Sequence, residues 1–426
     1  MKEINSALEK IKQVHEIVKN QERWRREECI NLIASESVLS PLAEKFFIND
    51  FEGRYNEHSE ESHYCGTKFA NDIEEFCKEI FMERFSTRFV DVRPISGAVA
   101  NMTIYYAFTK PFDNFISLGI QNGAHVSATR WGVAGFRGLK NIDAYFDEKR
   151  MNIDVDATAK LARRVEAKLI MLGGSLILFP QPIKELRESL GNDFLIVYDA
   201  AHVFGLIYAK EFQEPLKEGA DIITSSTHKT FQGPQGGIIL ARDSFEEDKW
   251  KKIENAIFPG LISNHHIHRL PALAITALEM NIFGKEYAKQ VIRNAKAFAE
   301  ELYNLGFDVL CPDLGFTESH QVIVNVKSLG GGRDVANRLE EANIICNKMS
   351  LPSDSPHDAT KNPSGIRFGV QEVTRFGMKE EDMKEIARFI KKLLIDKISI
   401  HTIKQEVIEF RKRFKKIHYC FNFEDI

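Results

Sequence analysis

The stretch "DIITSSTHKTFQGPQGGIILARD", residues 221–243, holds two apolar runs separated by a polar, glycine-rich turn. Short apolar runs of this kind are typical of strands that are buried on both faces of a sheet. The lysine of the turn, Lys229, precedes the glycines, whereas a nucleotide-binding P-loop needs the order Gly-Lys-Ser/Thr. The stretch therefore predicts two buried strands with a lysine just after the first, and it argues against a P-loop.

Similar runs precede this stretch in the chain. "KLIMLGG" begins at residue 168 and "FLIVYDAAH" at residue 194, and helical patterns alternate with the runs between residues 90 and 245. This alternation predicts an α/β fold with a mainly parallel sheet. Ligands of such sheets bind at the carboxyl ends of the strands. Asp199 and Lys229 each follow one of those ends, so we expect them at one site.

The two ends of the chain differ from this central part. Residues 1–30 are expected to form a helical arm, because apolar residues recur there at helical spacing between charged ones. The apolar stripe of the arm, which must be buried against the same chain or a partner subunit, consists of Ile4, Leu8, Ile11, Val14 and Val18. A long helical pattern over residues 267–305 leads to further strand patterns. We therefore predict a large domain over residues 31–285 and a smaller α+β domain over residues 286–426.

Composition narrows the class of protein. The chain has 57 Lys and Arg against 61 Asp and Glu, which gives no electrostatic reason to bind nucleic acid or an anionic membrane. Its 6 cysteines are scattered without metal-ligand spacing, as expected for reduced thiols. No segment approaches 18 uncharged apolar residues. We expect a cytoplasmic protein with a small-molecule substrate and no metal.

The residues at the predicted strand ends indicate a cofactor. Asp199 ends an apolar strand, where a carboxylate needs a cationic partner. Pyridoxal phosphate, held as a Schiff base by Lys229 and with its protonated ring nitrogen facing Asp199, would meet this need. Ser96 and Gly97 lie in a small-residue turn before a helical pattern, where backbone amides attract a phosphate. His125 offers a flat group that can stack on the ring.

Seven motifs extend this interpretation to a family. "NLIASES", "RYNEHSEESHYCGT", "PISGAVAN", "YDAAH", "THKTFQGPQGG", "FPG" and "SGIRFG" follow the order and spacing found in serine hydroxymethyltransferases. From residue 20 to about 390 the chain resembles this family, and archaeal members most of all. The resemblance implies fold type I of the pyridoxal phosphate enzymes, with a seven-stranded sheet and a homodimer that shares its active sites.

The resemblance also implies roles for single residues. Lys229 matches the Schiff-base lysine and His228 the residue before it, while Asp199 matches the partner of the ring nitrogen. The other matches on the cofactor side are the stacking His125, Ser175 and His202 near the phenolic oxygen, and Ser96 and Gly97 at the phosphate. Arg367 and Ser35 match the residues that bind the amino-acid carboxylate, a task suited to a bidentate guanidinium.

Further matches lie on loops that the family donates across the dimer. Tyr55 and the proton-relay glutamate, Glu57, come from the partner subunit in the family, and Tyr64 keeps the first tyrosine of a substrate motif. The family's Gly-rich loop after "FPG" is here "LISNHH", residues 261–266. We expect Ser263, Asn264 or His265 to replace its phosphate contacts.

Five single positions depart from the family pattern: Ser37, Cys65, Gln235, Met349 and, where the family has a second serine at the phosphate turn, Ala98. The first three lie around the expected substrate pocket and cofactor loop. Met349 stands where the family has an asparagine that contacts the pterin. A different pterin, or none, is therefore an open alternative to the usual folate.

Each residue also has a simpler explanation on its own. A lysine at the start of a loop is usually solvated, His125 and His202 are compatible with ordinary buried histidines, and Glu57 and Arg367 with surface charge and a salt bridge. Their joint occurrence in the family order favours the functional interpretation, which makes a non-catalytic homologue the weakest hypothesis.

Two enzymatic hypotheses follow. The first is interconversion of serine and glycine with transfer of the one-carbon unit to a reduced pterin, tetrahydrofolate or tetrahydromethanopterin. The second is an aldolase or transaldolase that acts on a β-hydroxy amino acid such as threonine with an aldehyde acceptor. Tyr55 and Glu57 favour the first hypothesis, whereas Cys65 and Met349 favour the second.

Overall fold

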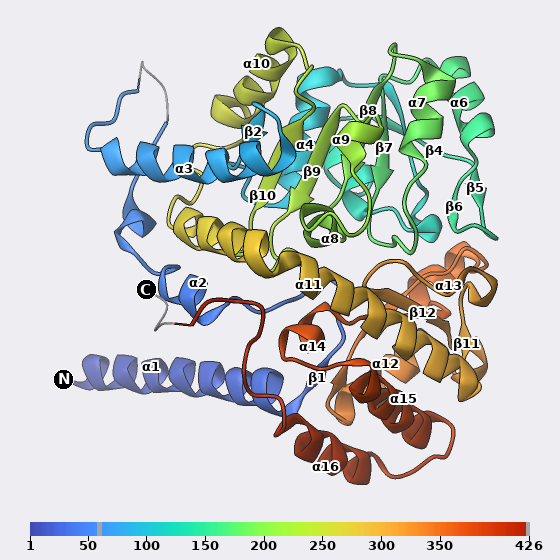
Figure 1. Cartoon of the computed structure of the whole chain (residues 1–426). Helices are drawn as coiled ribbons and strands as arrows, with labels where there is room; N and C mark the ends of the chain where they lie inside the picture. The colour runs from blue at the N-terminus through green and yellow to red at the C-terminus, as the bar shows by residue number, and fades with distance from the viewer. Residues whose placement is uncertain (58–61, 423–426) are drawn as a thin grey trace.

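A central seven-stranded sheet organises the computed structural model, which describes residues 1–57 and 62–422 (Figure 1). From edge to edge its strands are β2 (Val90–Asp91), β10 (Gly237–Ala241), β9 (Ile222–Ser226), β8 (Leu195–Asp199), β7 (Leu169–Gly173), β3 (Asn114–Ser117) and β4 (Lys140–Asp143). β10 is antiparallel to both of its neighbours, and the other pairings in this sheet are parallel. The predicted mainly parallel sheet is confirmed, as are the predicted runs that form β7 to β10.

Both faces of this sheet are covered, which explains the continuous apolar runs in its strands. Leu169 and Met171 of β7 belong to one hydrophobic cluster, and Ile170 and Leu172 to the other. Successive side chains thus point to opposite faces. The helices of this part of the chain are α2 (Pro41–Lys45), α3 (Lys68–Phe85), α4 (Gly97–Phe108), α5 (Val133–Phe136), α6 (Val155–Arg164), α7 (Ile183–Leu190), α8 (Phe204–Tyr208), α9 (Pro215–Glu218) and α10 (Glu247–Asn255).

A second sheet of four antiparallel strands lies in the C-terminal part. Its order is β11 (Asp308–Val309), β12 (Gln321–Asn325), β15 (Gly365–Gly369) and β14 (Asn347–Met349). The helices here are α12 (Gly332–Glu341), α13 (Pro356–Lys361), α14 (Gln371–Arg375), α15 (Glu380–Leu394) and α16 (Ile400–Arg411). Two-stranded pairings join β1 (Ile30–Asn31) to β13 (Ile344–Ile345) and β5 (Phe146–Asp147) to β6 (Asn152–Ile153).

One long helix, α11 (Arg269–Asn304), connects the two sheets (Figure 1). It contacts α3 and α8 beside the central sheet and α15 and β12 in the C-terminal part. The predicted domain boundary at residue 285 falls inside this helix and stays a prediction. Neither α11 nor any other helix in the described ranges combines the length and the apolar character that crossing a membrane requires.

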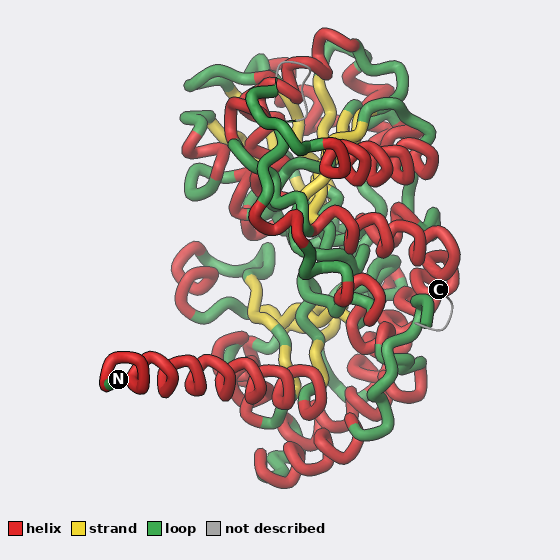
Figure 2. Tube along the Cα trace, turned by 90° about the vertical axis from the view of Figure 1, so that its left-hand side faces the viewer, coloured by secondary structure: helices red, strands yellow, loops and turns green. Residues whose placement is uncertain are grey.

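The N-terminal arm consists of α1 (Lys2–Gln21) followed by a π-helical segment, η1 (Glu22–Glu28). Helix α1 projects away from the rest of the chain (Figures 1 and 2), whereas η1 contacts α16. No residue of α1 is buried, and the five stripe residues keep exposed fractions between 50% and 64%. The stripe is therefore not buried against its own chain, and its burial against a partner subunit stays a prediction.

Further short helical segments are η2 (Asp50–Gly53), η3 (Ile120–Asn122), η4 (Val126–Ala128), η5 (Ala256–Leu261), η6 (Pro312–Leu314) and η7 (Lys327–Leu329). Two of these segments concern the site. η4 begins just after His125, which caps it, because the imidazole Nδ1 accepts a hydrogen bond from Ser127 N. η5 leads into the "LISNHH" loop that follows "FPG".

Candidate active site

A cavity of about 240 Å³ opens at the carboxyl edge of the central sheet, where β8 and β9 end. Its lining residues are Ser96, Gly97, Ala98, Asn101, His125, Gly174, Asp199, Ala201, His202, Ser226, His228 and Lys229. The structure thus brings together the lysine, the aspartate, the three histidines and the small-residue turn that the sequence predicts for one site.

Asp199 is the last residue of β8 and is only 6% exposed. Its carboxylate accepts hydrogen bonds from the Asn101 side-chain amide at 2.8 Å and from the Ala201 backbone N–H at 3.1 Å. Among the described residues, the carboxylate is held by these two hydrogen-bond donors and by no cation. It is therefore able to stabilise a positive charge in the cavity.

Lys229 follows β9 by three residues, and its Nζ donates a hydrogen bond to Ser226 Oγ at 2.6 Å. Burial lowers the pKa of Lys229 from 10.5 to about 8, although the nearby negative charge of Asp199 opposes the shift. At pH 7 roughly a tenth of the amine is therefore neutral, far more than for a free lysine. The neutral amine is the form that attacks a carbonyl.

Three imidazoles in this cavity are neutral at pH 7. Burial, assisted by the charge of Lys229, lowers the pKa of His228 to about 4. Burial is also the main cause that lowers the pKa of His125 and, much further, that of His202. The Nδ1 of His125 lies 2.8 Å from Ser127 Oγ, which fixes the ring in the cavity wall.

The small-residue turn forms the N-terminus of α4. Ser96 caps this helix, because its Oγ accepts a hydrogen bond from Val99 N at 3.1 Å. Gly97 lies so close to β9 that a Cβ atom there would be 3.1 Å from the backbone nitrogen of Ser226. A helix N-terminus at a polar cavity attracts an anion such as a phosphate.

Arg367 lies on β15 and is only 8% exposed. Its guanidinium donates to the backbone carbonyl of Ser175 at 2.5 Å and to the side-chain oxygen of Asn347 at 3.2 Å. Burial lowers its pKa to about 10, so the group stays charged at neutral pH. Because no carboxylate in the described ranges pairs with it, this cation is suited to bind an anionic ligand.

Ser35 is not part of the cofactor cavity. It lines a more open cleft of about 810 Å³, which shares His228 with that cavity. Ser37 and Gln235, two of the departures from the family pattern, line the same cleft. The substitutions are therefore neighbours in space, although almost 200 residues separate them in the sequence.

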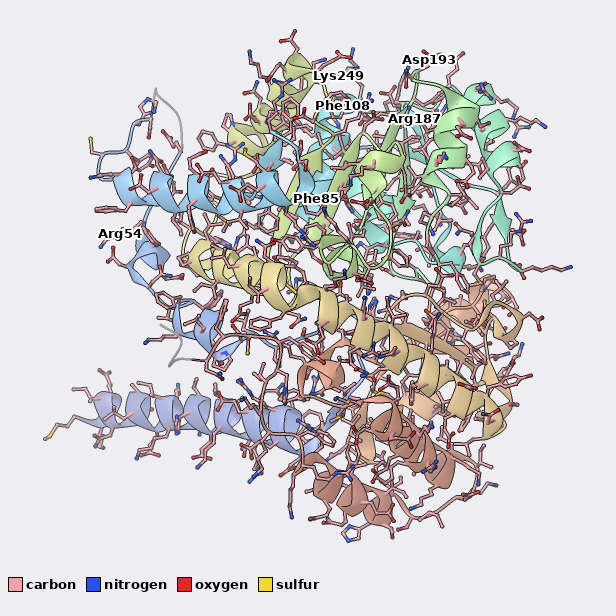
Figure 3. All side chains as sticks on the ribbon, in the orientation of Figure 1. Arg54, Phe85, Phe108, Arg187, Asp193 and Lys249 are labelled. Carbon is pink, nitrogen blue, oxygen red and sulfur yellow. The ribbon has the colours of Figure 1, made fainter. Side chains whose placement is uncertain are left out.

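A second group of predicted residues lies away from the cavity, on two loops that contact each other. Tyr55 OH lies 3.1 Å from Ser263 Oγ, and the rings of Tyr55 and Tyr64 stack with centroids 4.9 Å apart. The Asn264 side chain donates to the carbonyl of Arg54 at 2.8 Å. Arg54 lies at the outer side of the molecule, away from the central sheet (Figure 3).

Glu57 belongs to the same loop, directly before residues 58–61 of "RYNEHSEESHYCGT", which lie outside the described residues. Its carboxylate accepts a hydrogen bond from His63 N at 2.8 Å, and this bond is the main cause that lowers the pKa of Glu57. None of the loop residues of this second group lines the cavity around Lys229.

The remaining sequence expectations concern single positions. His265 is 2% exposed and its Nε2 lies 2.8 Å from a carboxylate oxygen of Glu74, so it is already engaged inside the chain. Cys65 is exposed. Met349 packs against a small apolar cluster that includes Leu176.

Sequence reasoning missed three polar residues of the site. Asn101 is the last residue of the quoted "PISGAVAN", one helical turn after Gly97, and this spacing is the signal that could have identified it. Ser226 contacts Lys229 at a spacing of three residues. Gln321 begins β12 and reaches His202 from the other sheet, a contact that no local pattern reveals.

Comparison with known proteins gives a consistent result. A model of the family "Serine hydroxymethyltransferase" matches residues 8–390. Proteins named serine hydroxymethyltransferase from Staphylothermus marinus and Sulfolobus acidocaldarius are each 49% identical to this chain, over 98% and 100% of it and over 95% and 97% of their own lengths.

The structure also resembles a solved one. The crystal structure of L-threonine transaldolase from Pseudomonas fluorescens, in the internal aldimine state, has a TM-score of 0.90 and 28% sequence identity to this chain. The match covers 100% of this chain and 98% of the transaldolase. The predicted fold type of the pyridoxal phosphate enzymes is thereby confirmed.

Proposed function

Because the chain belongs to the serine hydroxymethyltransferase family of pyridoxal-phosphate-dependent one-carbon transferases, we propose that it interconverts serine and glycine and passes the one-carbon unit to a reduced pterin. The pterin is tetrahydrofolate or tetrahydromethanopterin. The observation that carries the proposal is the cavity that Lys229 and Asp199 both line, near the buried guanidinium of Arg367, which has no carboxylate partner among the described residues and whose charge acts on Lys229. An aldehyde cofactor could bind covalently to Lys229 and place a cationic ring nitrogen at Asp199, and an amino-acid carboxylate could pair with Arg367.

The residues of the cavity fit pyridoxal phosphate. Lys229 supplies an amine with a lowered pKa, and Asp199 supplies a carboxylate for the ring nitrogen. Ser96 and Gly97 offer the N-terminus of α4 to the phosphate, and the neutral ring of His125 offers a face for stacking. When bound, the cofactor supplies an electron sink for the bond that breaks at the substrate Cα.

The substrate carboxylate is assigned to Arg367, assisted by Ser35. Arg367 is held by Ser175 O and Asn347 Oδ1, so its planar donor face is positioned before the substrate arrives. Holding the carboxylate would fix which bond at the substrate Cα is aligned for cleavage. His228, next to Lys229 on the wall shared with the cleft of Ser35, helps to close the cavity.

We assign the second group of residues to the active site of a partner subunit in a homodimer. The loop residues Tyr55, Tyr64, Ser263 and Asn264 gather on one exposed surface, and the stripe of α1 is exposed as well. A second copy of the chain would cover both surfaces. Glu57, donated in this way, would take the proton from the serine hydroxyl oxygen when the Cα–Cβ bond breaks.

The remaining assignments are supported by the sequence and the fold. The six free cysteines support a cytoplasmic location. The two sheets support a division into a large cofactor-binding domain and a smaller C-terminal domain, which meet along α11. The near balance of charge supports a small-molecule substrate.

Glycine formation tests the proposal. The purified protein with pyridoxal phosphate is given serine or threonine, each with and without tetrahydrofolate or tetrahydromethanopterin. Glycine from serine should form much faster with one of the pterins. Serine cleavage that no pterin accelerates, together with efficient threonine cleavage, would favour the transaldolase hypothesis. That hypothesis has the weaker support, because it rests on a 28% identical relative and on Met349, whereas serine–glycine interconversion rests on 49% identical relatives.

A further inference from the structure

Gln321, the first residue of β12, reaches from the C-terminal sheet into the wall of the cofactor cavity. Its side chain is fully buried, with an exposed fraction of 0%. Its oxygen Oε1 accepts a hydrogen bond from Ile177 N at 2.8 Å, and its nitrogen Nε2 donates to Ser175 O at 2.9 Å. The same nitrogen lies 3.0 Å from Nδ1 of His202.

The two backbone partners determine which way this amide points. If the amide were rotated by half a turn, its NH₂ would face the N–H of Ile177 and its oxygen would face the carbonyl of Ser175. Both contacts would then be lost inside the protein, and a buried unsatisfied polar group costs about 1–3 kcal/mol. The amide NH₂ of Gln321 therefore faces His202.

This orientation determines where His202 carries its proton. One hydrogen of the NH₂ goes to Ser175 O, and the other points at Nδ1 of His202. Nδ1 must then offer its lone pair, and a neutral imidazole has its single proton on Nε2. A second proton on Nδ1 would face a donor, in agreement with the strongly lowered pKa of this buried ring.

The other nitrogen of His202 is directed to the cavity. His202 is among the cavity-lining residues, and no protein acceptor for its Nε2 is found in the described ranges. The ring of His320 stacks against His202 at 5.7 Å between centroids and is itself held by a bond between its Nε2 and Ala34 O. The ring of His202 is thus restrained from one side and at one nitrogen.

We propose that Gln321 is a positioning residue that fixes His202 in the Nε2–H tautomer, so that the imidazole presents a hydrogen-bond donor to an oxygen acceptor in the cavity. Because His202 lines the same cavity as the amine of Lys229, the class of acceptor is a negatively charged oxygen. Its identification with the phenolic oxygen of pyridoxal phosphate rests on the proposed function, whereas the tautomer itself does not. Because Ser175 O also accepts from Arg367, Gln321 connects the cofactor side of the site to the carboxylate-binding side.

The tautomer can be measured without cofactor. The full-length, cofactor-free protein is labelled with ¹⁵N at histidine, long-range ¹H–¹⁵N correlations report which ring nitrogens carry protons, and the signals of His202 are assigned with the variant His202→Gln. We expect a protonated Nε2 and an unprotonated Nδ1. In Gln321→Glu the carboxylate still accepts from Ile177 N but no longer donates, so the proton should move to Nδ1.

A matched control separates positioning from general destabilisation. Gln213 is also buried, accepts from Gln181 N at 3.0 Å and donates to Gln181 O at 3.2 Å, without contacting His202. Gln321→Leu should weaken binding of pyridoxal phosphate about tenfold and mix the two tautomers, whereas Gln213→Leu should change neither.

Two results would overturn the inference: a proton on Nδ1 of His202 in the wild-type protein, or an unchanged tautomer in Gln321→Glu. A protein that shows the expected tautomer but binds no pyridoxal phosphate would contradict the proposed function and leave the role of Gln321 intact.

Discussion

Asn101 and Asp199 lie 98 residues apart in the sequence and meet through a hydrogen bond of 2.8 Å inside the cavity. The side-chain oxygen of Asn101 accepts in turn from Thr224 Oγ1 at 2.6 Å, which fixes the amide so that its NH₂ faces the carboxylate. Helix α4 and strand β9 thus together orient the Asp199 carboxylate at the end of β8.

Replacing Asn101 tests this arrangement. Asn101→Ala removes the amide donor, and a hydrogen bond to a charged group contributes about 1.5–3 kcal/mol. We expect the dissociation constant of pyridoxal phosphate, measured by absorbance titration, to rise roughly 10- to 100-fold. The control is Asn152→Ala, which removes a 2.8 Å bond to Pro180 O outside the cavity. Equal affinities of Asn101→Ala and the wild-type protein would show that Asn101 does not orient Asp199.

The lowered pKa of Lys229 predicts a pH-dependent stability of the cofactor-free protein. Between pH 10.5 and about 8 the lysine takes up a proton in the unfolded chain but not in the folded one, so stability falls as the pH decreases through this window. The loss is complete below pH 8 and amounts to roughly 3 kcal/mol. Lys229→Met should therefore be more stable than the wild-type protein at pH 7, with a gap that narrows towards pH 10.

Urea unfolding at several pH values measures this gap. Lys217→Met serves as the control, because Lys217 forms an exposed ion pair with Glu214 and should contribute little. If Lys229→Met and the wild-type protein were equally stable at pH 7, the pKa of the Lys229 amine would not be lowered by burial in the folded protein.

Donation of Glu57 across the dimer predicts complementation between two inactive variants. Glu57→Gln and Lys229→Ala should each have very low activity alone. When they are mixed and allowed to exchange subunits, each mixed dimer contains one site with an intact Lys229 and an intact partner Glu57. Random pairing should then restore about a quarter of wild-type activity. Absence of restored activity in verified mixed dimers would place Glu57 and Lys229 of one chain in the same site.

The exposed stripe of α1 predicts that a charge there weakens dimerisation. Burying an aliphatic side chain contributes about 1.5–3 kcal/mol, and each dimer contains two arms. Ile11→Glu should therefore raise the dimer dissociation constant at least ~100-fold in sedimentation experiments. Lys12→Glu, which changes the neighbouring residue and its exposed ion pair with Glu9, should have a small effect. Identical dissociation constants for both variants would mean that the stripe is not an interface.

The sequence predicted those parts of the molecule that depend on local patterns. Strands β7 to β10 were recognisable because both faces of the sheet are covered, which makes their residues continuously apolar. Asp199 and Lys229 were recognisable because one ends such a strand and the other lies three residues after the end of the next.

The contacts that the sequence could not predict join residues far apart in the chain. Gln321 belongs to an ordinary apolar strand pattern, and only the packing of two sheets places it next to His202. The same holds for His265, which pairs with Glu74 across the fold. The exposure of the α1 stripe is likewise not visible in its local pattern, which predicts only that the stripe is apolar.

The most direct test of the central claim, that Lys229 is the covalent anchor of the cofactor in this cavity, is peptide mass mapping after borohydride reduction. The purified protein with pyridoxal phosphate is reduced, digested and searched for a lysine that carries the phosphopyridoxyl group. The account predicts this group on Lys229 and a loss of labelling in Lys229→Ala. Labelling of a different lysine, or no labelling of the wild-type protein, would contradict it.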